Sequence, residues 1–168
     1  GNSFLVHFRS SEIQDKLIVP KNRLIELTKG SLTLGSLIVE PFSVSHDAAD
    51  PIGINVFAGN DKATIVTDTG VISDDVLRRI DDTTLLVLEA NYDPHMLRFG
   101  PYQSFLKQRV ASDEGHLSNE MAAQALLMMK RPDFMQVILA HRSENNNNAV
   151  LVTQTIGKML VDGGVRIG

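Results

Sequence analysis

Three side chains that can bind metal ions occupy the same kind of position in the sequence. His46, Asp68 and His141 each come directly after, or within two residues of, a short apolar run typical of a strand. In layered α/β proteins the loops beyond the strand ends gather at one edge of a sheet, where side chains from distant segments can converge. Two imidazoles and a carboxylate at such an edge would suit zinc, manganese or iron. The pattern therefore predicts a metal centre, against the alternative that each side chain only forms hydrogen bonds within its own loop.

The composition restricts the ligands that such a centre could use. The chain has no cysteine, so a metal would be held by His, Asp and Glu, and thiolate nucleophiles and disulfides are excluded. A net charge of -4 and a pI near 5.7 argue against a protein that coats nucleic acid through a broad basic face, but they leave room for a local basic groove.

The elements that must position these residues are strands and amphipathic helices in alternation. The 168 residues are 43% hydrophobic and 21% charged, which suits a folded domain. Ser73 and Ser118 are expected to cap helices, and Gly59 to Asp61 form a predicted hairpin turn. We expect strands at residues 37–44, 52–58, 63–67, 84–88 and 137–140, and helices at residues 74–80, 119–130 and 149–161.

The chain shows no sign of a membrane segment. No apolar stretch approaches the roughly 20 residues that a membrane span requires, and the first ten residues lack the layout of a signal peptide. We therefore expect a cytoplasmic protein with no membrane partner.

Four local sequences occur in an order that matches a known family. Together they resemble the metallo-β-lactamase superfamily, and within it the YycJ-like (WalJ-like) branch of bacterial hydrolases. The resemblance covers about residues 33–155 and implies an α+β fold, the αββα sandwich, of which this chain would hold mainly the C-terminal half. The four sequences are residues 45–51 (Ser-His-Asp-Ala-Ala-Asp-Pro), 67–70 (Thr-Asp-Thr-Gly), 115–119 (Gly-His-Leu-Ser-Asn) and 139–143 (Leu-Ala-His-Arg-Ser).

The resemblance implies a role for each matching residue. His46 would bind one of two divalent ions, zinc or manganese, Asp68 would bridge both ions, and His141 would bind the second. A metal-bound hydroxide would then attack a phosphodiester, which makes Asp68 a catalytic residue as well as a ligand. His116 would be the second catalytic residue, either contacting the phosphate or giving a proton to the leaving oxygen, unless it only packs locally.

Residues around these motifs suggest supporting roles. Lys107 and Arg109, with Arg98, could form a basic wall that binds substrate phosphates, although such charges are more often a solvated face. Glu89 ends an apolar run and could orient a metal-binding histidine from behind. The four asparagines at residues 145–148 are expected to form a solvated loop.

The expected activity is hydrolysis of phosphodiester bonds, with DNA or RNA as the substrate. One alternative keeps the fold but acts on a small phosphodiester or an ester. Another is a non-catalytic fragment that binds a partner, and self-association into a homo-oligomer is also considered.

One family motif is absent from the chain. The first metal motif, His-x-His-x-Asp-His, has no counterpart, since no two histidines are separated by a single residue. We expect one domain over residues 1–168 in which a segment is missing, with the join near residues 7–18. Each metal would then keep about two protein ligands, fewer than the three usual at catalytic zinc. Weak metal binding and an inactive enzyme are therefore expected of the chain as it stands.

Overall fold

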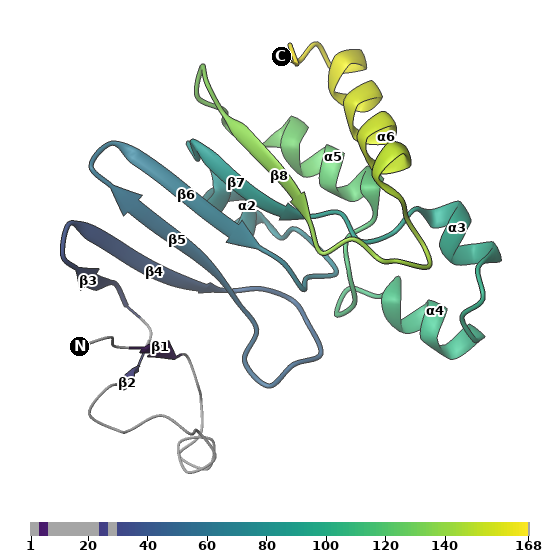
Figure 1. Cartoon of the computed structure of the whole chain (residues 1–168), viewed down its shortest axis with the longest axis horizontal. Helices are drawn as coiled ribbons and strands as arrows, with labels where there is room; N and C mark the ends of the chain where they lie inside the picture. The colour runs from purple at the N-terminus through teal and green to yellow at the C-terminus, as the bar shows by residue number, and fades with distance from the viewer. Residues whose placement is uncertain (1–3, 7–23, 27–29, 168) are drawn as a thin grey trace.

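The computed structural model describes residues 4–6, 24–26 and 30–167 (Figure 1). Its main element is a six-stranded sheet with the strand order β3-β4-β5-β6-β7-β8. A separate parallel pair joins β1 (Phe4–Val6) to β2 (Leu24–Glu26). The strands of the main sheet are β3 (Leu32–Leu34), β4 (Leu37–Ser43), β5 (Ile52–Ala58), β6 (Asp61–Val66), β7 (Leu85–Glu89) and β8 (Gln136–Ala140).

Strand direction decides which ends of the sheet meet. Strands β4, β5 and β6 are antiparallel neighbours, whereas β6, β7 and β8 are parallel. Because two antiparallel steps restore the original direction, β4 runs the same way as β6, β7 and β8. The carboxyl ends of these four strands therefore lie at one edge of the sheet.

Helices cover one face of the main sheet. Alternate strand side chains such as Val66, Leu86 and Leu88 are fully buried there, in one core shared with α2, α5 and α6. Two short helices, α3 and α4, lie together beyond the carboxyl ends of the strands (Figure 1). The described helices are α2 (Asp74–Ile80), α3 (Pro94–Phe99), α4 (Ser104–Val110), α5 (Asn119–Met128) and α6 (Ala149–Asp162).

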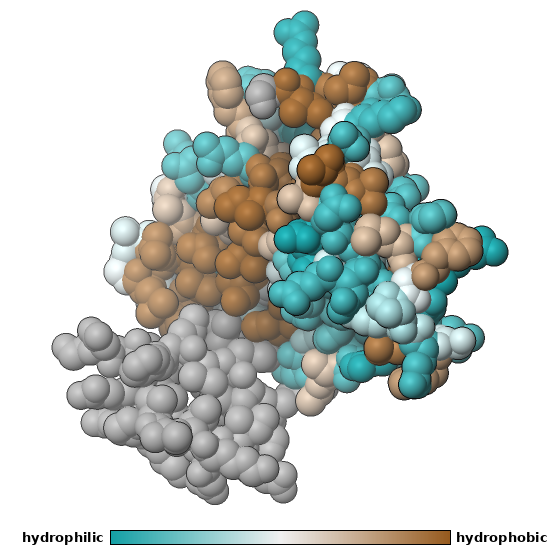
Figure 2. Space-filling view, turned by 45° about the vertical axis from the view of Figure 1, so that its right-hand side comes forward, coloured by the Kyte–Doolittle hydropathy of each residue, from teal (hydrophilic) through white to brown (hydrophobic). Residues whose placement is uncertain are grey.

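The opposite face of the sheet, which we call the open face, is also apolar. Strand register places Pro41, Ile54, Ile65, Val87 and Ile138 in one row across five strands. Within this row Ile65 is 41% exposed and Ile138 is 51% exposed. Figure 2 shows hydrophobic side chains gathered into a broad area on this side of the molecule. Strands that are apolar on both faces are typical of sheets covered on both sides.

Most of the expected elements are present with shifted ends. The α+β class is confirmed, as are the helix at residues 74–80, the strand at residues 52–58 and the caps at Ser73 and Ser118. Gly59 adopts φ 62° in the turn between β5 and β6, as a hairpin requires. The predicted helix at residues 119–130 ends at Met128, because Met129 is already extended.

Other expectations were wrong or lie outside the described residues. Three helices were expected, but α3 and α4 are also present, and β3 was not predicted. The asparagine run is not a solvated loop, since Asn146 and Asn147 are only 1% and 2% exposed. The predicted join near residues 7–18 falls outside the described part of the chain. Among the described residues, none of the helices has the length and apolar character that crossing a bilayer requires.

Candidate metal centre

The residues singled out from the sequence come from loops at the shared edge of the sheet. His46 follows β4, Asp68 follows β6, Glu89 ends β7 and His141 follows β8. Asp68 and His141 adopt left-handed backbone conformations, with φ 55° and φ 53°. Such conformations are uncommon for residues other than glycine, and they cluster at functional sites. The turn at each strand end thus re-aims the side chain toward the edge of the sheet.

Asp68 lies between two imidazoles. Its Oδ1 atom is 3.9 Å from His46 Nε2 and 3.5 Å from His141 Nε2. The ring of His116 lies between those of His46 and His141, with a centroid distance of 5.1 Å to each. The structure therefore brings together all four residues expected in the metal centre or in catalysis.

The donor set fits a divalent cation. His46, Asp68 and His116 each offer one ligand atom, and these atoms lie within 4.8 Å of one another. Imidazole nitrogen with carboxylate oxygen is the combination that zinc and similar ions take in proteins that use no cysteine. From the sequence His116 was expected only on the substrate side, whereas the geometry also makes it a candidate ligand.

Glu89 orients two of the histidines through hydrogen bonds to their Nδ1 atoms. Its side chain is fully buried, and Oε1 accepts hydrogen bonds from Nδ1 of His116 at 2.7 Å and from Nδ1 of His141 at 2.8 Å. Its Oε2 atom accepts a third bond from the backbone N–H of Thr69 at 2.8 Å. Because the Nδ1 atoms are engaged, the Nε2 atoms are left as the possible metal ligands.

The remaining histidine is oriented by backbone. Nδ1 of His46 donates to the carbonyl oxygen of Gly115 at 3.1 Å, which again leaves Nε2 available. A Cβ atom on Gly115 would lie 2.2 Å from the carbonyl oxygen of Arg109, so only glycine fits between the end of α4 and the metal centre.

The hydrogen bond from His116 to Glu89 has an electrostatic consequence. It is the main cause that raises the pKa of His116 above its ordinary value, while burial of the imidazole opposes the shift. A protonated His116 is thereby favoured.

Two asparagines that sequence reasoning missed support this arrangement. Asn91 Nδ2 donates to the carbonyl oxygen of His141 at 2.7 Å and so holds the strained turn after β8. Asn147 Nδ2 in turn donates to the carbonyl oxygen of Ala90 at 3.1 Å and to Asn119 Oδ1 at 2.8 Å. For Asn147, the feature of the sequence that could have indicated this role was the asparagine run that follows the His141 motif.

The basic residues expected to bind substrate are only partly at the centre. Arg109 lines the cleft of about 470 Å³ above the histidines, together with Tyr102 and Arg142. Its Nε atom donates to the Asp47 carboxylate, which holds the pKa of Asp47 below its usual value. Lys107 does not line the cleft, and its Nζ donates to the carbonyl oxygen of Arg98 at 2.8 Å.

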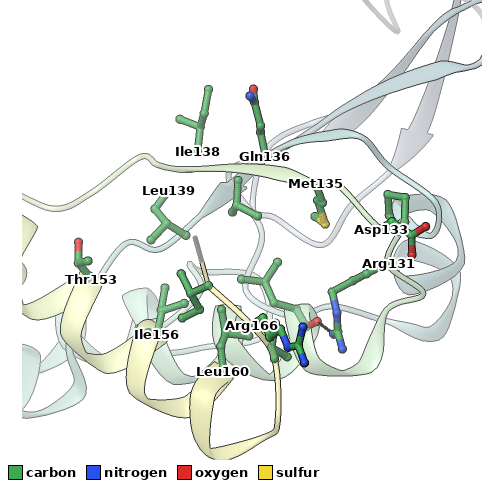
Figure 3. Close-up of a pocket in the computed structure, with 16 residues that line it drawn as sticks. Arg131, Asp133, Met135, Gln136, Ile138, Leu139, Thr153, Ile156, Leu160 and Arg166 are labelled. Atoms are coloured by element: carbon green, nitrogen blue, oxygen red, sulfur yellow. Dashed lines mark hydrogen bonds between the residues drawn. The ribbon is translucent and has the colours of Figure 1, made fainter.

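A larger hollow lies elsewhere, between β8 and α6 (Figure 3). Leu139, Ile156 and Leu160 point into it, whereas Ile138 and Gln136 point away. None of the candidate catalytic or metal-binding residues lines it, so its volume of about 1040 Å³ does not make it the site of chemistry.

Comparison with known proteins supports the resemblance seen in the motifs. The family model described as the β-lactamase superfamily domain matches residues 4–141. A Bacillus anthracis protein named exodeoxyribonuclease YycJ is 38% identical over 136 residues, which are 81% of this chain and 52% of the relative. Exodeoxyribonuclease WalJ of Streptococcus pneumoniae (strain D39) is 32% identical over 159 residues, which are 95% of this chain and 59% of the relative.

A solved structure gives the same picture of the fold. The metallo-β-lactamase fold protein YhfI from Bacillus subtilis superposes with a TM-score of 0.69 at 14% identity, over 94% of this chain and 60% of YhfI. The chain spans a little over half the length of the curated relatives that it matches.

Proposed function

The chain belongs to the β-lactamase superfamily, and from this premise we propose that it forms the metal-binding part of a nuclease that hydrolyses phosphodiester bonds in DNA. The single observation that carries the proposal is the position of Asp68 Oδ1 between the Nε2 atoms of His46 and His141. The names of the two relatives, both exodeoxyribonucleases, support DNA as the substrate.

The metal-binding roles follow from the donor atoms. The metallo-β-lactamase fold implies a divalent metal, which His46, Asp68 and His141 would hold, with Asp68 shared when two ions are bound. A bound divalent cation would act as a Lewis acid toward phosphoryl oxygens and would lower the pKa of water. Glu89 holds the Nε2 atoms of His116 and His141 toward the cleft, so those atoms need no rearrangement to bind.

His116 would supply the proton that the reaction requires. Breaking a phosphodiester leaves an alkoxide oxygen, which departs more easily when it is protonated. The Glu89 carboxylate favours the imidazolium form of His116, and the ring lines the cleft in which the substrate would lie. Metal binding and proton donation by His116 would both use its Nε2 atom. His116 can therefore donate a proton only when His46 and His141 hold the metal.

The proposal is tested by removing the shared carboxylate. In a form of the protein that also carries the first metal motif, Asp68→Ala should abolish both metal binding, measured by titration calorimetry with Zn²⁺ and Mn²⁺, and hydrolysis of a labelled DNA oligonucleotide. Asp82→Ala is the matched control, because Asp82 is an exposed aspartate with nearly the same backbone, φ 56° against φ 55° for Asp68. Both variants thus carry the same left-handed strain, and only the first loses the ligand.

Full activity in Asp68→Ala would remove the metal proposal. Hydrolysis of bis-p-nitrophenyl phosphate without any hydrolysis of DNA would instead favour the small-molecule alternative. Absence of metal binding in the unsubstituted protein that carries the first metal motif would favour the non-catalytic binding fragment.

A further inference from the structure

The segment that carries α3 and α4, residues 94–110, differs in composition from the rest of the chain. We call it the α3–α4 wall. It contains no aspartate or glutamate, although the chain has 20 of them and a net charge of -4. It carries the cations Arg98, Lys107 and Arg109. The wall therefore carries positive charges on an acidic protein, although the charge of Arg109 is paired with Asp47.

The wall also exposes aromatic rings. Phe99 is 68% exposed and Phe105 is 67% exposed, whereas Phe42 in the core is only 5% exposed. Burying such a ring is worth about 1.5 to 3 kcal/mol, so leaving two of them in water forgoes stability that the fold could have gained.

The exposed Phe99 ring lies beside a cation. The Arg98 guanidinium is 5.4 Å from the centroid of the Phe99 ring, and the His95 ring is 4.6 Å from it. Neither Arg98 nor Lys107 forms an ion pair with a carboxylate within residues 30–167. Their charges thus remain available to an anion outside the chain.

The wall continues into the metal centre. Tyr102, in the connection between α3 and α4, lines the cleft above His46, Asp68 and His141, as do Leu106 and Arg109 of α4. Tyr102, Leu106 and Arg109 thus connect the wall to the cleft.

Exposed aromatic rings in one segment with unpaired cations suit single-stranded nucleic acid, because each unpaired base has a free face for stacking and each phosphate needs a counter-charge. In a duplex the base faces are already stacked on one another. Surfaces that bind another protein are usually depleted of charged residues at their centre. Unpaired charges of one sign therefore fit nucleic acid better than a protein partner.

We propose that the α3–α4 wall binds single-stranded DNA, whose bases stack on Phe99 and Phe105 while Arg98 and Lys107 contact its phosphates, and that it leads the strand into the metal cleft. The choice of DNA rests on the proposed nuclease function. The stacking surface itself rests on the exposed rings and the unpaired cations.

Binding can be measured without hydrolysis, by fluorescence anisotropy of a labelled 15-nucleotide oligo-dT in EDTA. Phe99→Ala and Phe105→Ala should each weaken affinity about tenfold, the effect of losing one stacked base. Phe105→Tyr should keep the affinity, because tyrosine stacks equally well. The matched control is Phe134→Ala, which removes a ring that is 89% exposed but lies outside the wall, just before β8.

A second probe separates stacking from charge. An abasic oligomer of the same length has the same phosphates but no bases, so it should bind the unaltered protein at least about tenfold more weakly than oligo-dT. The double variant Phe99→Ala/Phe105→Ala should bind the two oligomers with the same affinity. A double variant that still preferred oligo-dT, or single variants that bound it normally, would overturn the proposal.

The remaining outcomes distinguish this proposal from the nuclease proposal. Loss of oligo-dT affinity in the Phe variants, with no hydrolysis by a form of the protein that also carries the first metal motif, supports the wall and contradicts the nuclease. Normal hydrolysis and normal affinity in the same variants contradict the wall alone. A change in sedimentation of the Phe variants with unchanged DNA affinity would show a protein interface and overturn it, and equal affinity for oligo-rU would contradict the choice of DNA.

Discussion

The floor of the metal centre and the α3–α4 wall are built in opposite ways. By the floor we mean the buried residues Glu89 and Asn147, which support the loops that carry the candidate metal ligands. In the floor, Glu89 and Asn147 are buried, and each bonds to several partners at once. In the wall, Arg98, Phe99 and Phe105 are exposed to solvent. Positions that must be fixed to a fraction of an ångström are held by buried hydrogen bonds, whereas a flexible strand can be held by side chains that adapt. Substitutions in the floor should therefore have the largest effects, and the loss of a single cation from the wall the smallest.

The largest effect is expected from Glu89→Gln. The amide presents an NH₂ group to the cluster and removes the charge that two imidazole N–H groups share, so His116 and His141 lose their fixed orientation. Affinity for Zn²⁺ should fall about 10- to 100-fold, as is usual when a partner behind a ligand is lost. Titration calorimetry measures this, and Glu40→Gln, on β4, serves as the control. Unchanged affinity would mean that the floor does not position the ligands.

The next effect in size is expected from Asn147→Ala. This change leaves the buried Asn119 amide and the carbonyl of Ala90 without a partner, which should lower the free energy of unfolding by about 2 to 3 kcal/mol. Urea denaturation measures the difference. Asn145→Ala, at an exposed position of the same run, should change little. Equal losses in both variants would contradict a special role for the buried asparagine.

The smallest effect is expected from Lys107→Ala in the wall. One lost phosphate contact should weaken oligo-dT binding only a few-fold and reduce the slope of log affinity against log salt by about 1. The control is Lys158→Ala, since Lys158 is already paired with Asp162 on α6. A loss as large as that from Glu89→Gln would break the contrast between floor and wall.

Much of the fold could be predicted from local sequence. Apolar runs, serine caps and Gly59 act over a few residues, so strands, three helices and a hairpin followed from them. The convergence of His46, Asp68 and His141 was also predictable, because parallel strand ends meet at one edge. Motif order identified the family. The number of metal ions, the substrate and self-association stay predictions.

Other features depend on contacts between distant residues. Helices α3 and α4 are only six and seven residues long and are separated by Gly100 and Pro101, so their pattern is too short to recognise. The burial of Asn147 depends on partners 28 and 57 positions away. The shared use of Glu89 by two histidines depends on how the ends of β7 and β8 meet the loop before α5. Polar residues in a loop look alike in sequence whether water or the protein satisfies them.

Gly115 connects the metal centre to the α3–α4 wall. Its carbonyl orients His46, and its missing side chain admits the end of α4, which belongs to the wall. A side chain at position 115 would displace the end of α4 and would also change the orientation of the His46 imidazole. Substitutions at exposed positions such as 99, 105 and 107 should therefore leave the metal ligands in place, whereas any side chain added at position 115 should disturb both regions together.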